Sequence, residues 1–311
     1  MVIPLYPPLE KWDLKKYKHH KDNNLSPSFL KRGRGDYQNN EVVCLEVFSA
    51  EKKRDNNKMK TALTIAGSDP TGGAGLQADL KVFKAFDVHG LSVVSAITAQ
   101  NTVGVDSIYP VERDFLEKQL RILLSDIKPD ALKIGMLYSK WAVEIVADML
   151  KEYSLSNLVI DPVTVSSSGM SLVDNRTLDT IREKLFPFSK VITPNIYEAS
   201  VFTGIRIENK NDMKDAAKVL KEMGPEVVVI TGGHLEEIAL DLYYDGEFHS
   251  IEGEKIKGEY HGTGCAFSAA VTALFALGHI PLEAVRRAKE FVNNAIKKAY
   301  HPGRGMGLLY L

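Results

Sequence analysis

The stretch that decides the fold class is residues 261–270, which read His261-Gly262-Thr263-Gly264-Cys265-Ala266-Phe267-Ser268-Ala269-Ala270. Two glycines permit a tight turn, and the apolar-periodic segment that follows predicts a long helix. Because the first N–H groups of a helix have no partner within it, the turn predicts an anion-binding loop. A helix N-terminus lowers the pKa of a thiol, so we expect Cys265 to be partly thiolate near neutral pH and able to accept a proton. The alternative is a flexible loop before a buried helix, with Cys265 as an ordinary buried side chain.

A second glycine-rich loop occurs near residue 70. A short β-prone run at residues 61–66 precedes Gly67-Ser68-Asp69-Pro70-Thr71-Gly72-Gly73-Ala74-Gly75, and an amphipathic stretch follows at 76–86. This order predicts a strand, a glycine-rich loop and a helix. The loop lacks the Gly-Lys-Ser/Thr ending of a Walker loop and the glycine spacing of a dinucleotide fingerprint. We therefore interpret it as a contact surface for a small molecule.

From residue 61 onward, β-prone runs alternate with amphipathic segments. The predicted strands cover residues 91–99, 131–134, 158–160, 191–193 and 227–231, and the predicted helices cover 113–126, 141–153, 177–185 and 213–223. This succession predicts an α/β fold, a doubly wound and mostly parallel sheet with helices on both faces and ligand sites at the carboxyl ends of its strands. Asp245-Gly246 separates two short β-prone runs within residues 240–251, so one edge of the sheet is expected to be an antiparallel hairpin.

Composition and charge exclude several classes of protein. The 311 residues are 44% hydrophobic, but no apolar run approaches the ~18 residues that a membrane-spanning helix needs, so we expect a soluble enzyme without a membrane partner. A formal net charge of −1 gives no electrostatic footprint for nucleic acid. The two cysteines, Cys44 and Cys265, cannot form a disulfide framework, which predicts a reducing, cytoplasmic setting.

The character of the chain changes near residue 59. Residues 1–58 contain 12 Lys/Arg and 8 Asp/Glu, a formal charge of +4, whereas the remainder carries −5. The segment has no sustained periodicity, which predicts a disordered extension ahead of a single domain at 59–311. Its acidic residues and the lack of an apolar stretch argue against a targeting peptide. We favour Met59 as the functional start, with the extension either upstream translation or a dispensable tail.

Four shorter motifs accompany the two glycine loops: Thr98-Ala99-Gln100-Asn101-Thr102, Lys133-Ile134-Gly135-Met136-Leu137, Asp161-Pro162-Val163 and Thr193-Pro194-Asn195-Ile196-Tyr197-Glu198-Ala199. In this order, the motifs resemble those of hydroxymethylpyrimidine/phosphomethylpyrimidine kinases, thiamine-pathway members of the ribokinase-like superfamily. The resemblance covers about residues 59–311. It implies a ribokinase-like fold and the ATP-dependent phosphorylation of 4-amino-5-hydroxymethyl-2-methylpyrimidine to its monophosphate and then to the diphosphate. It also implies Mg²⁺ with ATP, a monovalent cation as a candidate activator, and a homodimer.

The resemblance assigns the phosphoryl-transfer residues. Cys265 is implied to deprotonate the hydroxymethyl group, and the backbone N–H groups of Gly262, Thr263, Gly264 and Cys265 are implied to hold the transferring phosphoryl group as an anion hole. The residues implied to contact ATP and its phosphates are Asp161, Asn195, Glu198, Thr231 and Gly232. Of these, Glu198 is implied to act on magnesium through a metal-bound water. An ordinary helix start is the alternative for Asn195 and Glu198, and a strand-end cap is the alternative for Asp161.

Substrate recognition is assigned in the same way. The residues that match substrate contacts in the family are Gly67, Asp79, Gln100, Met136 and Val163. Gln100 offers a donor and an acceptor together, which suits an exocyclic amine beside a ring nitrogen. A strand-end amide is the alternative for Gln100, and plain pocket packing is the alternative for Met136.

Two positions depart from the family pattern. Ser167 stands where many members carry a lysine, and Thr231 stands where some do. Fewer cations near the phosphates predict slower turnover or a greater dependence on metal and monovalent cations. Active relatives also show the substitution at Thr231, so this expectation rests on Ser167. Two other functions remain open. A pyridoxal or pyridoxine kinase acts on a similar planar ring with a hydroxymethyl group, although Gln100-Asn101-Thr102 favours the pyrimidine. The other is a non-catalytic ligand-binding protein on a kinase fold, which only the missing lysine supports.

Overall fold

The computed structural model describes residues 59–165, 172–232 and 239–311. The predicted extension over residues 1–58 lies outside the described residues. The strands are β1 (Thr61–Ser68), β2 (His89–Gln100), β3 (Val105–Pro110), β4 (Ala131–Ile134), β5 (Leu158–Ile160), β6 (Val191–Ile192), β7 (Val227–Gly232), β8 (Ala239–Tyr244), β9 (Phe248–Gly253), β10 (Tyr260–His261) and β11 (Gly307–Leu308). The helices are α1 (Gly75–Ala85), α2 (Arg113–Asp126), α3 (Lys140–Glu152), α4 (Asn175–Lys184), α5 (Ile196–Thr203), α6 (Lys210–Glu222), α7 (Thr263–Ala276) and α8 (Pro281–Lys297), with a 3₁₀ turn at Phe186–Phe188.

One large sheet organises these elements, with the strand order β3-β2-β1-β4-β5-β6-β7-β8-β9. The six strands in the order β2-β1-β4-β5-β6-β7 pair with one another in the parallel sense. The predicted hairpin is confirmed as β8 and β9, which continue the sheet in antiparallel pairing. Strand β1 lies between β2 and β4, so the winding direction reverses beside it. In doubly wound sheets such a reversal marks the crevice where ligands bind.

The opposite edge of the sheet is also antiparallel, which the sequence did not predict. Strand β3 pairs with β2 in the antiparallel sense, with Ile97 opposite Tyr109. Its residues are half-buried or exposed and it ends at Pro110, so its sequence contains no continuous apolar run from which a strand could be predicted. A separate two-stranded sheet joins β10 to β11 and holds the C-terminal segment beside the start of α7.

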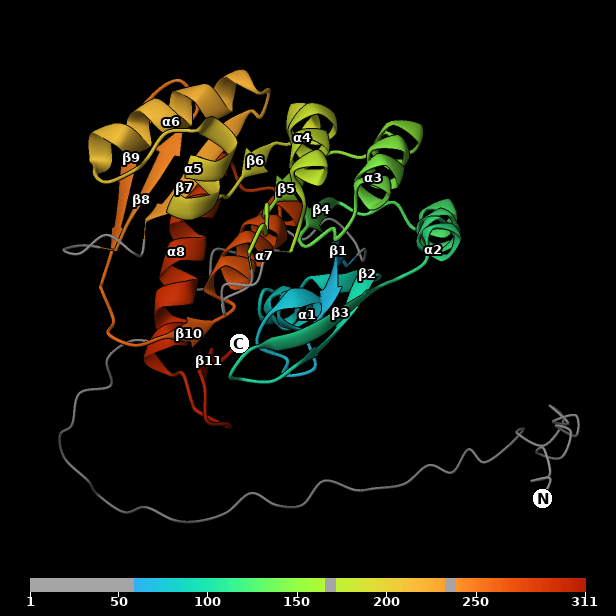
Figure 1. The fold of residues 1–311 in the computed structure, drawn as a ribbon, viewed down its shortest axis with the longest axis horizontal. Coiled ribbons are helices and arrows are strands. Elements are labelled where there is room, and N and C mark those ends of the chain that lie inside the picture. Colours follow the sequence, from blue (N-terminus) through green and yellow to red (C-terminus); the bar gives the residue numbers. More distant parts are fainter. Residues whose placement is uncertain (1–58, 166–171, 233–238) are drawn as a thin grey trace, which may run out of the picture. The chain divides into compact units, whose positions relative to one another are not determined.

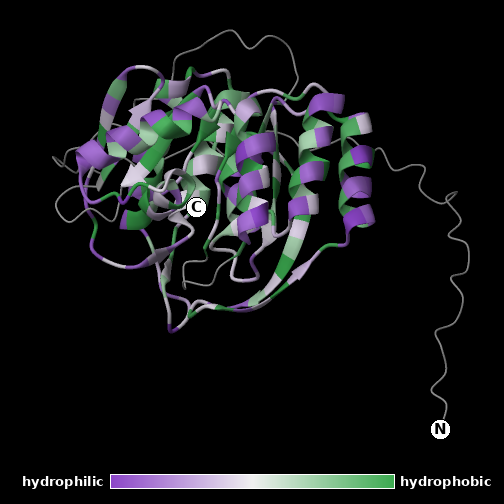
Figure 2. Cartoon of the chain, turned by 45° about the horizontal axis from the view of Figure 1, so that its top comes forward, coloured by the Kyte–Doolittle hydropathy of each residue, from purple (hydrophilic) through white to green (hydrophobic). Residues whose placement is uncertain are grey.

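Helices cover both faces of the sheet (Figure 1), and a hydrophobic core lies on each face. Leu63 and Ile65 of β1 face the core shared with helices α2 to α6, whereas Ala62 faces the core shared with α1, α7 and α8. This alternation follows from the two-residue period of a strand. Figure 2 shows hydrophilic residues in stripes along the helices, as expected for helices that cover a sheet with one face. The prediction of helices on both faces is confirmed.

Helix α7 is the central helix of the second core. Every residue from Ala266 to Ala276 is buried, and the helix contacts β1, β4, β5, α1 and α8. Burial on all sides explains why its sequence is apolar throughout and rich in alanine. Although α7 is so apolar, neither it nor another described helix combines the length and the hydropathy needed to cross a membrane. Its role in the fold is to bring its first turn to the carboxyl edge of the sheet.

Candidate active site

A cavity of about 1240 Å³ opens at the carboxyl ends of the parallel strands. Its wall includes residues at or just after the ends of β1, β2, β4, β5, β6 and β7, together with the first turn of α7. This is the expected place for a ligand in a doubly wound sheet. The cavity brings together all but two of the residues proposed from sequence: Gly67, Gln100, Met136, Val163, Asp161, Asn195, Glu198, Thr231, Gly262, Thr263, Gly264 and Cys265.

The two glycine loops meet at the start of α7. Gly262 caps this helix in the left-handed region at φ 82°, and a Cβ there would collide with the carbonyl oxygen of Gly73. A Cβ on Gly73 would in turn meet the ring of His261. Both positions therefore need glycine, because one loop backbone rests directly on the other. The Ala266 N–H donates to Gly262 O at 2.8 Å, so the N–H groups of residues 263–265 precede the helical hydrogen bonds, as an anion loop requires.

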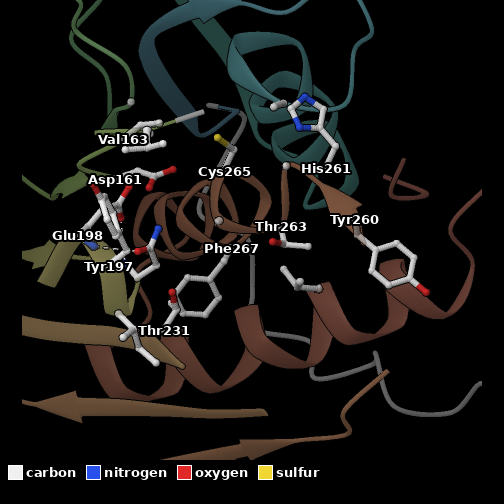
Figure 3. Close-up of a pocket in the computed structure, with 18 of the residues that line it drawn as sticks. Asp161, Val163, Tyr197, Glu198, Thr231, Tyr260, His261, Thr263, Cys265 and Phe267 are labelled. Carbon is white, nitrogen blue, oxygen red and sulfur yellow. Dashed lines mark hydrogen bonds between the residues drawn. The ribbon is translucent and has the colours of Figure 1, made fainter. Parts of the chain in front are cut away.

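Cys265 is the third residue of α7 and reaches the cavity wall. Figure 3 shows it with Asp161 and Glu198 on one side and His261 on the other. Burial raises the pKa of the Cys265 thiol to about 12, and the partial relief given by Lys133 does not reverse the rise. The expectation of a partly ionised thiol is therefore wrong. Loss of hydration outweighs the helix dipole, so Cys265 is a neutral thiol near pH 7 in the ligand-free site.

A buried charge cluster lies at the cavity wall, which Lys133 and Asp161 help to line. Lys133 of β4 is fully buried, and its Nζ lies 2.5 Å from Asp79 Oδ1 and 3.8 Å from Asp161 Oδ2. Thr64 Oγ1 donates to the second oxygen of Asp79 at 2.6 Å. Asp79 is 0% exposed and does not line the cavity. In the described structure its carboxylate holds the buried lysine, and the contact of Asp79 with the substrate stays a prediction.

Lys133 begins one of the sequence motifs but was not predicted to be a site residue. Burial opposes its charge, but Asp79, Cys265 and Asp161 together outweigh burial, so the pKa of Lys133 is raised above the usual value. Ser268 Oγ lies 3.0 Å from Asp161 Oδ2, which connects the cluster to α7 near Cys265. The available signal was a lysine inside a strand whose other residues are all apolar, since lysine is almost never fully buried without a partner. Which residue pairs with Lys133 could not be predicted from the sequence.

Asn195 and Glu198 form a capping box at the start of α5. The Glu198 N–H donates to Asn195 Oδ1, and the Asn195 N–H donates to Glu198 Oε2, both at 2.9 Å. The ordinary helix-start role is therefore real, and both residues also line the cavity. Burial raises the pKa of Glu198, and the neighbouring Asp161 raises it further. A cation placed beside two such carboxylates relieves their repulsion.

The oxygen atoms of Asp161 and Glu198 fit a magnesium ion that is held mainly by water and phosphate oxygens. No cluster of three His, Cys, Asp or Glu side chains suited to a metal occurs within residues 59–165, 172–232 and 239–311. Mg²⁺ commonly takes one or two carboxylates and completes its shell with waters and phosphate oxygens. Asp161 and Glu198 match this pattern. In the described part of the chain, the buried Thr164 Oγ1 near Glu198 also has no hydrogen-bond partner.

Gly232 is the second proposed residue that does not line the cavity. Its N–H donates to Asp241 Oδ1 at 3.1 Å, and Asp241 Oδ2 pairs with Lys289 at 2.8 Å. Its donor group is thus paired with a buried carboxylate, and the contact of Gly232 with ATP stays a prediction. Thr231, one residue earlier, does line the cavity. Lys289 also lines it, and the sequence reasoning missed this residue.

The same cavity also contains Gly67, Gln100, Met136 and Val163. A Cβ on Gly67 would strike the Met136 methyl group, so glycine is needed for this close contact. The Met136 backbone is held by Ser95, whose Oγ donates to Met136 O at 2.6 Å. Asp69 and His261 lie beside Gln100 and line the same cavity, although the sequence reasoning gave neither a role.

Comparison with known proteins gives this geometry a context. The model of the phosphomethylpyrimidine kinase family matches residues 69–309. The chain belongs to this family. It is also 42% identical over 250 residues to the hydroxymethylpyrimidine/phosphomethylpyrimidine kinase of Bacillus subtilis (strain 168), a match that covers 79% of this chain and 92% of the relative.

Solved phosphomethylpyrimidine kinases and pyridoxal kinases share the fold. The phosphomethylpyrimidine kinase of Clostridium difficile 630 is 40% identical, has a TM-score of 0.68, and is matched over 76% of this chain and 99% of the other. The pyridoxal kinase from Staphylococcus aureus in complex with AMP-PCP and pyridoxal is 35% identical, has a TM-score of 0.76, and is matched over 81% of this chain and 93% of the other. The ribokinase-like fold predicted for this phosphomethylpyrimidine kinase family member is thus confirmed.

Ser167, the position of the family's frequent lysine, lies outside the described residues, as does Cys44. The effect of Ser167 on this family member stays a prediction. At the C-terminus, Met306 lines the cavity, and its N–H donates to Thr102 O at 3.0 Å. The C-terminal segment therefore completes the wall beside the strand that carries Gln100.

Proposed function

We propose that the chain transfers the γ-phosphoryl group of ATP to 4-amino-5-hydroxymethyl-2-methylpyrimidine and then to its monophosphate, in thiamine biosynthesis. The observation that carries the proposal is one cavity that combines an anion loop and two carboxylates with an amide and its apolar neighbours, in a member of this family. The anion loop and the carboxylates suit the phosphates of ATP, and the amide suits a planar ring with paired donors and acceptors.

In the first step, the hydroxymethyl oxygen bonds to the γ-phosphorus while the bond from that phosphorus to the β,γ-bridging oxygen breaks, and ADP leaves. The N–H groups of residues 262–265 stabilise the charge on the transferring phosphoryl group. Cys265 takes the hydroxyl proton, and it can do so only as a thiolate, which burial disfavours and Lys133 favours. In the second step the nucleophile is already an anionic phosphate, so Cys265 matters less.

We assign Asp161 and Glu198 to the magnesium ion, with Glu198 acting through a metal-bound water. The ion supplies positive charge beside the β- and γ-phosphates when bound. Without it, the raised pKa of Glu198 means that this carboxyl resists ionisation. Glu198→Gln should therefore keep or raise the melting temperature of the metal-free protein but abolish the additional stabilisation by MgATP over ATP with EDTA. An unchanged magnesium effect would show that Glu198 does not act on the magnesium ion.

Replacing NaCl with KCl in the activity assay tests whether a monovalent cation activates the protein.

The second candidate function is a pyridoxal kinase, which the similarity to the Staphylococcus aureus enzyme favours. An assay of ADP release with hydroxymethylpyrimidine, its monophosphate and pyridoxal separates the candidates. We expect the highest kcat/KM with the pyrimidine and clear turnover of its monophosphate. A preference for pyridoxal would replace the proposal with the second candidate. No ADP release with any of the three would favour a non-catalytic binding protein.

We further propose a homodimer in the cytoplasm. Exposed large apolar side chains gather on and beside strands β2 and β3, where Ile97, Val103 and Tyr109 are 49%, 63% and 61% exposed. Such a surface suits a second copy of the chain. A free thiol at the site, Cys265, suits a reducing compartment. Light scattering coupled to gel filtration tests the dimer, and Tyr109→Lys should weaken it.

A further inference from the structure

The Asp69 carboxylate is surrounded by hydrogen-bond donors. Its Oδ1 accepts the Thr71 N–H at 2.8 Å, and its Oδ2 accepts the Thr71 hydroxyl at 2.9 Å and the Ala74 N–H at 2.8 Å. His261 Nε2 also lies 2.9 Å from Oδ2. Burial opposes the charge of Asp69, but these donors outweigh it and lower the carboxyl pKa below its ordinary value. An ionised carboxylate only accepts, so His261 Nε2 must carry a hydrogen.

The same Nε2 lies 3.2 Å from the Gln100 side-chain amide. With the amide Nε2 toward His261, its Oε1 lies 3.0 Å from Thr98 Oγ1. In that orientation two donors face each other, because both nitrogens carry hydrogens. The Thr98 side has the matching conflict. The Thr98 hydroxyl has one hydrogen, and it donates this to Ser68 O at 2.9 Å. It therefore cannot also donate to Gln100.

A half-turn of the Gln100 amide removes both conflicts. Its oxygen then shares the His261 Nε2–H with Asp69 Oδ2 in a three-centre hydrogen bond, and its nitrogen donates to Thr98 Oγ1, which still donates to Ser68. Two independent sets of contacts thus demand the same orientation, and a wrong orientation would leave two buried or half-buried contacts repulsive. After the half-turn, the amide keeps one lone pair on the His261 side and one N–H on the Thr98 side.

We propose that Asp69 and His261 are a positioning pair that fixes the orientation of the Gln100 amide and so selects a substrate ring by the order of its donor and acceptor. The proposal rests on the proposed function and deepens it. The ring places its exocyclic amine toward the His261 side of Gln100 and its adjacent ring nitrogen toward the Thr98 side. Pyridoxal carries no amine beside its ring nitrogen, so it gains less from a fixed amide.

The first test uses the unmodified protein. A long-range ¹H–¹⁵N spectrum of histidine side chains reports whether His261 Nε2 carries a hydrogen, with His261→Gln identifying the signal. We expect a protonated Nε2. An unprotonated Nε2 overturns the proposal, because His261 would then accept from Gln100 and the amide would lie the other way. This measurement is independent of activity, so it stays decisive even if the proposed function fails.

The second test measures specificity, defined as kcat/KM for hydroxymethylpyrimidine divided by kcat/KM for pyridoxal. His261→Phe removes the N–H and should lower this ratio about tenfold, mainly through KM for the pyrimidine. His261→Gln is the matched variant, since its amide N–H reaches about as far as His261 Nε2, and it should restore most of the ratio. Asp69→Asn should lower the ratio in the same direction.

A double-mutant cycle separates positioning from a structural effect. In a Gln100→Leu background, His261→Phe should change the specificity ratio by less than about twofold, because the amide that it positions is gone. An undiminished effect in that background would overturn the proposal. So would a parallel loss for both substrates with a raised KM for MgATP and a lowered melting temperature, because that pattern indicates general damage to the loop. If the unmodified protein turns over neither substrate, the proposed function fails, and the NMR result alone decides the orientation.

Discussion

At the scale of single residues, Cys265 shows two opposing effects on one thiol. Its place in the first turn of α7 predicts an acidic thiol, and the sequence gives that place correctly. The structure adds burial next to Asp161 and Asp79, and burial prevails. A run of sequence letters cannot report this, because the carboxylates come from residues distant along the chain. The helix position was predictable, but the state of the thiol was not.

Replacing Cys265 with alanine tests its role as a base. The substitution removes the thiol and keeps the backbone N–H groups, so kcat on the free alcohol should fall by on the order of 10²-fold or more while KM for MgATP changes little. The rate of the unmodified enzyme should also rise with pH from about 7 to 9 as thiolate accumulates, and the variant should lack that rise. Phosphorylation of the monophosphate is the internal control and should suffer less. Equal, small losses in both steps would show that the thiol only packs.

The raised pKa of Cys265 also predicts a pH dependence of stability. The folded state holds the thiol proton up to about pH 12, whereas the unfolded chain releases it near the ordinary value of 9.0. The contribution is therefore complete below pH 9.0 and is lost as pH rises toward 12. Urea unfolding of the unmodified protein should weaken more steeply above about pH 9 than unfolding of Cys265→Ala. Identical slopes would mean that the thiol titrates normally in the folded protein.

At the scale of secondary-structure elements, burial decides what the sequence reveals. Strands β5 and β7 were predicted because the apolar runs Leu158–Ile160 and Val227–Gly232 are buried on both faces. Strand β3 was missed because its residues are half-buried or exposed at a sheet edge. Helix α2 was predicted over its full length from its amphipathic pattern. A helix or strand can be predicted when its buried residues recur with the period of that structure. An edge strand that pairs with a single neighbouring strand and buries little cannot.

Strand β4 and helix α1 are joined by the ion pair between Lys133 and Asp79. The two residues are 54 positions apart, and neither sequence context indicates the other. The sequence therefore did not indicate that the Asp79 carboxylate holds Lys133. The glycine loops differ, because the glycines in the sequence already indicate that the backbone makes close contacts there. Local requirements were visible in the sequence, whereas pairing between distant elements was not.

Removing one partner of this pair should be costly. Lys133→Met leaves Asp79 and Asp161 buried without their cation, so the free energy of unfolding should fall by about 3–5 kcal/mol. Urea unfolding at pH 7 measures the change. The matched control is Lys133→Met combined with Asp79→Leu, which removes both charges and should recover part of the stability. If the double variant is no more stable than Lys133→Met, the lysine acts through Asp161 or through packing instead.

At the scale of the whole molecule, the site depends on both layers of helices. The anion loop is fixed by α7 from one layer, and Glu198 is fixed by α5 from the other. The sheet between them places both at the same carboxyl edge, which is why residues far apart in sequence share one cavity. The sequence predicted this edge from the βαβ succession alone. It did not predict the strand order or the second antiparallel edge, since both depend on which distant strands pair.

The last prediction concerns how much of the chain the enzyme needs. Every residue of the two hydrophobic cores in the described structure lies between residues 62 and 309, and the family match spans 69–309. Residues 1–58 are polar and lack periodicity, so we predict that they add neither core nor site. A protein that begins at Met59 should keep the melting temperature of the full chain within error. Saturating MgATP should raise both melting temperatures equally, since stabilisation by a ligand depends only on its affinity and concentration. A markedly lower melting temperature after truncation would show that the extension packs on the core, and a smaller MgATP shift at an unchanged melting temperature would place it at the nucleotide site.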